Sequence, residues 1–108
     1  MPDLAYASAL DLADAIRRRQ VSSREALEVF LARIASLDRT INSAVTIDAE
    51  RARAEADEAD RVLARGEARG SLHGVPMTIK VSLQTRGMRT TSGAPDLANF
   101  VPQEDAWP

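Results

Sequence analysis

The fold of this chain depends most on residues 73–83, which read HGVPMTIKVSL. The stretch is rich in β-branched and other apolar residues that alternate with polar ones, a pattern that predicts a strand over 75–81. Successive side chains of a strand point to opposite faces. One face would be apolar throughout, and therefore buried, with Val75, Met77, Ile79 and Val81. The other face would carry Pro76, Thr78, Lys80 and Ser82.

Lys80 is the only lysine among the 14 lysine and arginine residues of the chain. Lysine, unlike arginine, can lose its proton when it is desolvated or set beside another cation. On the predicted strand it has hydroxyls two residues away on each side, and a neutral amine beside hydroxyls can act as a base and proton relay. Two other interpretations stay open: a chance lysine in an arginine-rich composition, and a lysine that protects a sheet edge against aggregation.

The first half of the chain is dominated by helical signals. The sequence predicts helices over about 8–19, 22–37 and 49–65, and strands over about 43–47 and 75–81. A strand, a helix and a second strand within about 40 residues read as a right-handed βαβ crossover with parallel strands. We therefore expect an α/β fold. So few strands would leave apolar surface exposed around residues 75–79, or would bury it against another copy of the chain.

The predicted helices have recognisable starts. Ser8 stands three residues before Asp11, and Ser22 three residues before Glu25, which is the spacing of a capping box. Asp48 can cap the third helix. The second helix carries an apolar stripe that we expect to pack in the core, formed by Leu27, Phe30, Leu31, Ile34 and Leu37.

Composition narrows the function. A chain of 108 residues with a formal net charge of −2 fits one small domain without a general grip on nucleic acid. It has no cysteine and one histidine, so we expect no disulfide, no thiolate catalysis, no metal site and no cofactor. We see neither an export signal nor a run of membrane-spanning length, and expect a cytoplasmic protein.

Residues 70–93, GSLHGVPMTIKVSLQTRGMRTTSG, resemble the stretch around the catalytic lysine of the amidase signature family. That family commonly reads G-P-L-H-G-(V/I)-P-x-x-(I/V)-K-D, followed by T-x-G-x-x-T-T-x-G. Upstream, REALEVFLARIASLDRTINSAVTID and ADRVLARGEARGSLHG also resemble family segments, in the expected order. The resemblance runs from about Ser8 to Asp105. It implies that residues 1–108 are an N-terminal fragment of an amidase domain, an α/β fold with a large mixed sheet flanked by helices.

The resemblance implies hydrolysis of carboxylic amides through a Ser–cis-Ser–Lys triad, with Lys80 as its lysine. Held neutral, Lys80 would take a proton from the bridging serine, which in turn deprotonates the nucleophilic serine. Backbone donors would stabilise the tetrahedral intermediate, and an acyl-enzyme would then react with water. The substrate would be a small amide.

The chain departs from the family pattern in several places. Val81 stands where the family usually has an aspartate, which we expect to disturb a supporting polar network rather than the base. The Gly/Ser-rich signature of the two serines lies further downstream in the family, and neither Ser82 nor Ser92 has such surroundings. The ending Trp107-Pro108 also differs, which favours a truncated piece. His73 is expected to brace the loop before the lysine, not to act as a base.

Three hypotheses follow. The first is an amidase fragment that carries the base but is inactive alone. Within it, the alternative is the glutamine-hydrolysing component (the A component) of a tRNA-dependent amidotransferase of the glutamyl-tRNA(Gln) type, which releases ammonia from glutamine together with partner subunits. The third is a non-catalytic helical module that docks on a partner, for which Lys80→Arg or Lys80→Met would be harmless.

Overall fold

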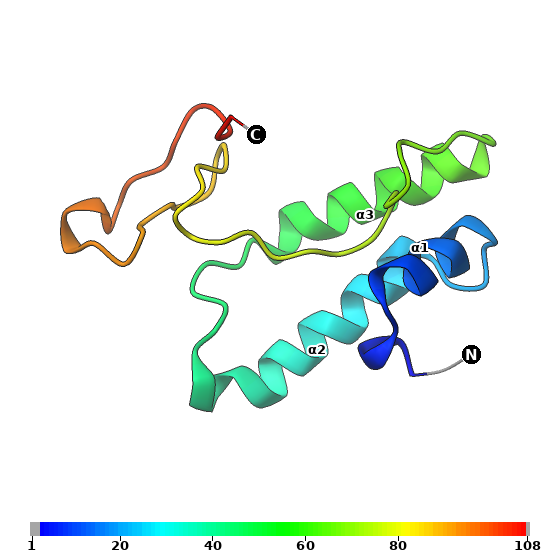
Figure 1. The fold of residues 1–108 in the computed structure, drawn as a ribbon, viewed down its shortest axis with the longest axis horizontal. Helices are drawn as coiled ribbons and strands as arrows, with labels where there is room; N and C mark the ends of the chain where they lie inside the picture. The colour runs from blue at the N-terminus through cyan, green and yellow to red at the C-terminus, as the bar shows by residue number, and fades with distance from the viewer. Residues whose placement is uncertain (1–2, 108) are drawn as a thin grey trace. The chain divides into compact units, whose positions relative to one another are not determined.

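The computed structural model describes residues 3–107, which contain three α-helices and two short 3-10 helices (Figure 1). The α-helices are α1 (Ala9–Arg17), α2 (Ser23–Ile41) and α3 (Ala49–Ala64). The 3-10 helices are η1 (Leu4–Tyr6) and η2 (Pro95–Leu97). The described residues divide into two compact units. Unit 1 comprises residues 3–42 and 49–76, and unit 2 comprises residues 43–48 and 77–107.

The α/β prediction is wrong, because residues 3–107 contain no strand. The two segments predicted as strands, 43–47 and 75–81, have irregular backbone. A strand depends on a neighbour that satisfies its backbone N–H and C=O groups, and a short pair of strands is marginal without further ones. Pro76 also has no N–H to offer to a ladder. Apolar alternation can therefore give these segments a preference for sheet, but not the partners that a sheet requires.

The helices begin where their side chains can satisfy free backbone amides. Ser8 Oγ accepts a hydrogen bond from the Asp11 N–H at 3.1 Å and donates one to its carboxylate at 2.7 Å. Ser22 and Glu25 form the complete capping box predicted from their spacing, with bonds of 2.8 and 3.0 Å. The hydrogen bond from Ser22 N–H lowers the pKa of Glu25. Helix α2 continues past the predicted end and stops at Asn42, whose φ of 52° is left-handed.

A single hydrophobic core lies in unit 1, where α1 meets the start of α2 and the end of α3. Ile16 and Val62 are its largest fully buried side chains. Around Ile16 the buried cluster also contains Leu12, Ala15, Val21 and Ala26, with Leu63 and Val75 among the residues packed against it.

The apolar stripe of α2 is only partly the core contact that its pattern predicts. Leu27 is buried, whereas Leu37 is 53% and Ile41 is 72% exposed. The buried residues of α2 all lie in its first two turns, where the core gathers. Helical periodicity identifies the apolar face of a helix, but it does not tell how much of that face another element covers.

Ion pairs join α2 to α3 at the surface of unit 1. Arg53 donates two hydrogen bonds to the Glu28 carboxylate at 2.7 and 3.1 Å, and Arg24 donates one to Glu28 at 2.9 Å and one to Asp57 at 2.7 Å. The bonds from Arg53 and then Arg24 lower the pKa of Glu28 from 4.5 to about 2. These side chains are exposed by about 40%, so water screens the pairs and their effect on stability is modest.

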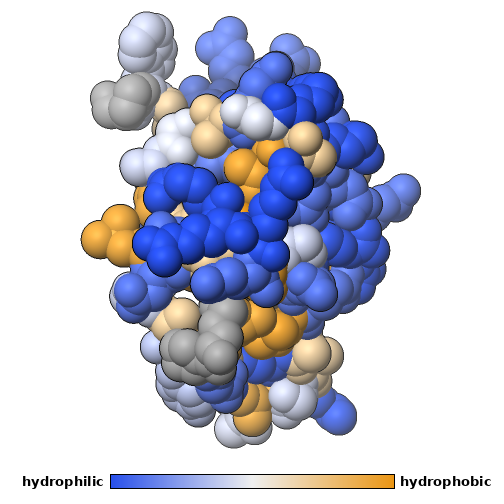
Figure 2. All heavy atoms as spheres, turned by 90° about the vertical axis from the view of Figure 1, so that its right-hand side faces the viewer, coloured by the Kyte–Doolittle hydropathy of each residue, from blue (hydrophilic) through white to orange (hydrophobic). Residues whose placement is uncertain are grey.

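The face of the molecule in Figure 2 is covered mostly by hydrophilic side chains, with hydrophobic atoms showing between them. None of the helices in the described part of the chain is both long enough and apolar enough to cross a membrane.

Candidate active site

The candidate site begins with the loop that leads from α3 toward Lys80, and His73 holds this loop in place. The chain turns back along α3 after the helix ends (Figure 1). His73 Nδ1 accepts a hydrogen bond from the Arg69 N–H at 2.9 Å, and Nε2 lies 2.8 Å from the Ala59 carbonyl oxygen of α3. A neutral ring with its proton on Nε2 satisfies both partners. Both nitrogens are thus engaged in bracing the loop, which agrees with the role expected for His73.

Gly74 fixes the chain to α2 a few residues before the lysine. Ser23, which is 3% exposed, donates a hydrogen bond from Oγ to the Gly74 carbonyl at 2.6 Å. The φ of Gly74 is +78°, and a Cβ at this position would lie 3.1 Å from Ser23 Cβ and 3.2 Å from Ile16 Cγ2. Only glycine combines this backbone conformation with so close an approach to buried neighbours. The next residue, Val75, packs against the core.

Asp60 supports the same anchor from α3. Its carboxylate accepts hydrogen bonds from the Ser23 N–H at 2.7 Å and the Arg24 N–H at 3.1 Å. These two amides belong to the first turn of α2, where backbone donors have no partner within the helix. The negative charge also interacts favourably with the positive end of the helix dipole. Asp60 therefore holds Ser23 in the position from which it reaches Gly74.

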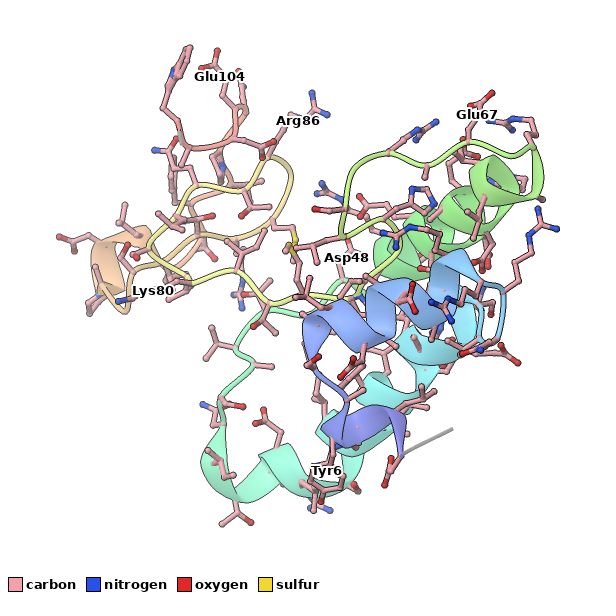
Figure 3. All side chains as sticks on the ribbon, turned by 45° about the vertical axis from the view of Figure 1, so that its right-hand side comes forward. Tyr6, Asp48, Glu67, Lys80, Arg86 and Glu104 are labelled. Atoms are coloured by element: carbon pink, nitrogen blue, oxygen red, sulfur yellow. The ribbon has the colours of Figure 1, made fainter. Side chains whose placement is uncertain are left out.

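Lys80 lies in unit 2 on an irregular segment, and its side chain is exposed (Figure 3). Its carbonyl oxygen accepts a hydrogen bond from the Leu83 N–H at 2.9 Å, which closes a turn over Val81 and Ser82. The chain therefore reverses directly after the lysine. This corrects the predicted alternation of faces, in which the hydroxyls at 78 and 82 flank the amine on one side of a strand.

The second half of the lysine motif returns to the lysine segment. The Ser92 N–H donates a hydrogen bond to the Val81 carbonyl at 3.3 Å. Ser92 has a φ of 49° and Gly93 a φ of 68°, so two successive left-handed residues form this bend. Ser82 and Ser92 themselves are exposed.

Thr90 is a polar hub of unit 2 that the sequence analysis did not single out. It is 4% exposed, and its N–H donates to the Phe100 carbonyl at 2.9 Å. Its hydroxyl donates to the Met88 carbonyl at 3.1 Å and accepts from the Thr85 N–H at 3.4 Å. The only available signal was its place in the threonine pair of the resemblance, because nothing in residue type distinguishes a buried threonine from an exposed one.

Two further backbone hydrogen bonds pair residues 84–90 with residues 100–106. The Gly87 N–H donates to the Pro102 carbonyl at 3.0 Å, and the Ala106 N–H donates to the Gln84 carbonyl at 2.8 Å. The Arg86 N–H also donates to the Asp105 carboxylate at 2.8 Å. The lysine segment is thus attached to a doubled loop. In the part of the chain that the structure describes, no group of three or more histidine and acidic side chains is arranged to hold a metal ion.

Comparison with known proteins identifies the family. The model of the amidase family matches residues 25–107, a range that includes Lys80, Thr90 and most of α2. The chain belongs to the amidase family. The resemblance found in residues 70–93 is thereby confirmed.

Its amidase relatives are much longer proteins. Two of them are the amidase-family component, designated A, of glutamyl-tRNA(Gln) amidotransferase. The one from Moorella thermoacetica is 41% identical over 104 residues, which cover 96% of this chain and 21% of that protein. The one from Moraxella catarrhalis is 45% identical over 106 residues, which cover 98% of this chain and 21% of the relative. The chain spans about a fifth of the length of these curated relatives.

A solved structure shares the fold of this amidase chain. It comes from a vestigial protein complex described as revealing the evolutionary origins of an s-triazine catabolic enzyme. The TM-score is 0.85 at 31% sequence identity, and the match covers 92% of this chain and 22% of the other.

Proposed function

We propose that Lys80 is the proton acceptor of an amidase that hydrolyses carboxylic amides by a Ser–cis-Ser–Lys mechanism. The two serines of that mechanism would lie in amidase polypeptide outside residues 1–108, which we interpret as an N-terminal portion of the domain. One observation carries the proposal: the family match over 25–107 contains both halves of the lysine motif, and the bond from Ser92 N–H to the Val81 carbonyl joins them. We propose a cytoplasmic location for the protein.

The role of Lys80 follows from the chemistry of the amide bond. An amide carbonyl is attacked by a serine oxygen only when a base removes the hydroxyl proton. In the proposed relay the Lys80 amine takes a proton from the bridging serine, which takes one from the nucleophile. Attack gives a tetrahedral oxyanion that needs hydrogen-bond donors. Its collapse breaks the C–N bond, the departing amine takes a proton, and water then cleaves the acyl-enzyme ester.

The chain alone is expected to be inactive because it brings the base without the nucleophile. The purified 108-residue chain should not hydrolyse acetamide, benzamide or glutamine faster than buffer does. Lys80→Ala, which leaves the fold of unit 1 untouched, is the control. Turnover that is present in the pure chain and abolished in Lys80→Ala would refute this expectation.

A second candidate is an amidotransferase component that hydrolyses glutamine and hands ammonia to partner subunits. It is favoured by the names of the relatives at 41% and 45% identity, against 31% for the solved structure associated with s-triazine catabolism. Replacing the matched segment of the Moraxella catarrhalis relative with this chain would separate the two. Glutamine hydrolysis well above that of acetamide favours the amidotransferase component, and the reverse order favours a stand-alone amidase.

The same chimera tests the lysine. Lys80→Arg and Lys80→Met should each reduce its amide hydrolysis by at least about a hundredfold, because neither side chain can accept the proton. Full activity in both variants would favour the non-catalytic module instead.

A further inference from the structure

Unit 2 lacks a hydrophobic core. Among its described residues, 43–48 and 77–107, only Thr90 and Pro102 are buried. Every apolar side chain of the main buried cluster belongs to unit 1. Burial of apolar surface is the main force that holds a folded unit together. Unit 2 therefore depends on something outside residues 3–107 to cover it.

The side chains that need cover are large and apolar. Met77 is 72%, Ile79 is 52% and Leu83 is 51% exposed. We call the following residues of unit 2 the apolar docking set: Val45, Ile47, Met77, Ile79, Leu83, Phe100 and Val101. A monomeric protein rarely leaves so much apolar side chain in water, and such residues mark interaction sites.

Unit 2 also offers a concave seat for a partner's side chain. An open hollow of about 390 Å³ is lined by Gln84, Phe100, Val101, Pro102, Gln103 and Glu104. It lies along one arm of the doubled loop, beyond the bond from Thr90 N–H to the Phe100 carbonyl. Two of its lining residues, Phe100 and Val101, belong to the apolar docking set.

The length of the relatives indicates the occupant. They align with 96% and 98% of this chain, unit 2 included, and yet these matches account for only 21% of their own length. About four-fifths of each relative is thus polypeptide that this chain does not contain. A second copy would bring only another coreless unit 2.

We propose that the apolar docking set of unit 2 binds the remaining part of an amidase domain, even when that part is supplied as a separate polypeptide, and that binding covers Lys80. Docking would give the lysine amine the water-poor surroundings in which a neutral lysine is favoured. The proposal rests on the family membership of the chain. It depends on the proposed function only where amide hydrolysis is the measurement.

The single lysine makes the test clean. The 108-residue chain is coexpressed with the Moraxella catarrhalis relative from which the segment matching this chain has been removed. The complex is isolated, its affinity is measured after separation and mixing, and acylation of Lys80 by an amine-reactive ester is followed by mass spectrometry. We expect a one-to-one complex in which acylation of Lys80 is at least about tenfold slower than in the free chain.

Matched variants locate the surface. Met77→Arg and Ile79→Arg place a charge in the docking set and should weaken binding at least about tenfold. Leu10→Arg is the control, because Leu10 is 71% exposed on α1 and Met77 is 72% exposed. None of the three should change the helical circular dichroism of the free chain. Binding that is equally sensitive to all three variants, or to none, overturns the proposal.

The remaining outcomes separate docking from catalysis. A complex that protects Lys80 but hydrolyses no amide supports the docking surface and contradicts the proposed function. Absence of any complex, or a homodimer of this chain that already protects Lys80, overturns the docking surface. If the truncated relative cannot be kept in solution, the covalent chimera decides. Its melting temperature should fall with Met77→Arg and not with Leu10→Arg, and equal values contradict the proposal.

Discussion

Replacing Gly74 with alanine tests the anchor that connects unit 1 to the lysine segment. The φ of +78° places this residue in a left-handed conformation, which costs a non-glycine residue about 1–2 kcal/mol. The added Cβ would also lie 3.1 Å from Ser23 Cβ and 3.2 Å from Ile16 Cγ2. Ser23 is 3% and Ile16 is 1% exposed, so neither side chain has room to move away.

The expected loss of stability has two parts. Backbone strain contributes about 1–2 kcal/mol, and overpacking of a closed core typically costs about 1–3 kcal/mol. We therefore expect Gly74→Ala to lower the free energy of unfolding of unit 1 by about 2–5 kcal/mol. Small domains have only about 5–15 kcal/mol in total, so the variant should be visibly destabilised.

Gly70→Ala is the matched control. Gly70 has a φ of +89°, but a Cβ built on it meets no atom within 4 Å. This variant therefore carries the strain without the crowding and should lose about 1–2 kcal/mol. Urea unfolding of each chain, followed by helical circular dichroism, gives both values, since all the α-helices lie in unit 1.

The difference between the two variants isolates the contact with Ser23 and Ile16. It should be about 1–3 kcal/mol in the direction of a less stable Gly74→Ala. If Gly74→Ala costs no more than Gly70→Ala, the close packing of the loop against α2 is wrong, and with it the argument that this glycine positions the chain ahead of Lys80.

Three further predictions concern unit 1. Ser23→Ala removes the 2.6 Å bond to the Gly74 carbonyl and should cost about 1–2 kcal/mol, with faster amide hydrogen exchange in residues 72–76. The pKa of Glu28 is about 2 in the folded chain against 4.5 when unperturbed, so the unfolded state takes up a proton first as the pH falls. Its contribution is thus complete above pH 4.5 and lost toward pH 2, and Glu28→Gln should flatten this part of a stability–pH curve, whereas an unchanged slope contradicts the ion pairs. His73→Ala removes the contacts to Arg69 and Ala59 and should cost about 1–2 kcal/mol, while mobility confined to residues 67–73 in hydrogen exchange would distinguish bracing from a core defect.

The candidate site was only partly accessible from sequence. The lysine motif indicated the family and Lys80, and the family match agrees with that resemblance. The hydroxyl neighbours predicted for Lys80 depended on a strand, and the turn closed by Leu83 removes that premise. Thr90 was missed because its hydrogen bonds go to residues at 85, 88 and 100, and such partners are not written in the residue type.

The sequence by itself determined the helices of this amidase chain and the places where they start. Helical hydrogen bonds and caps join residues three or four apart, so Ser22 and Glu25 encode their own contact wherever the helix lies. Only the tertiary structure decided whether an apolar segment becomes a strand, or an apolar stripe becomes core. Residues 75–81 and the end of α2 have the right side chains for both, but pairing and burial need a second surface from elsewhere in the polypeptide.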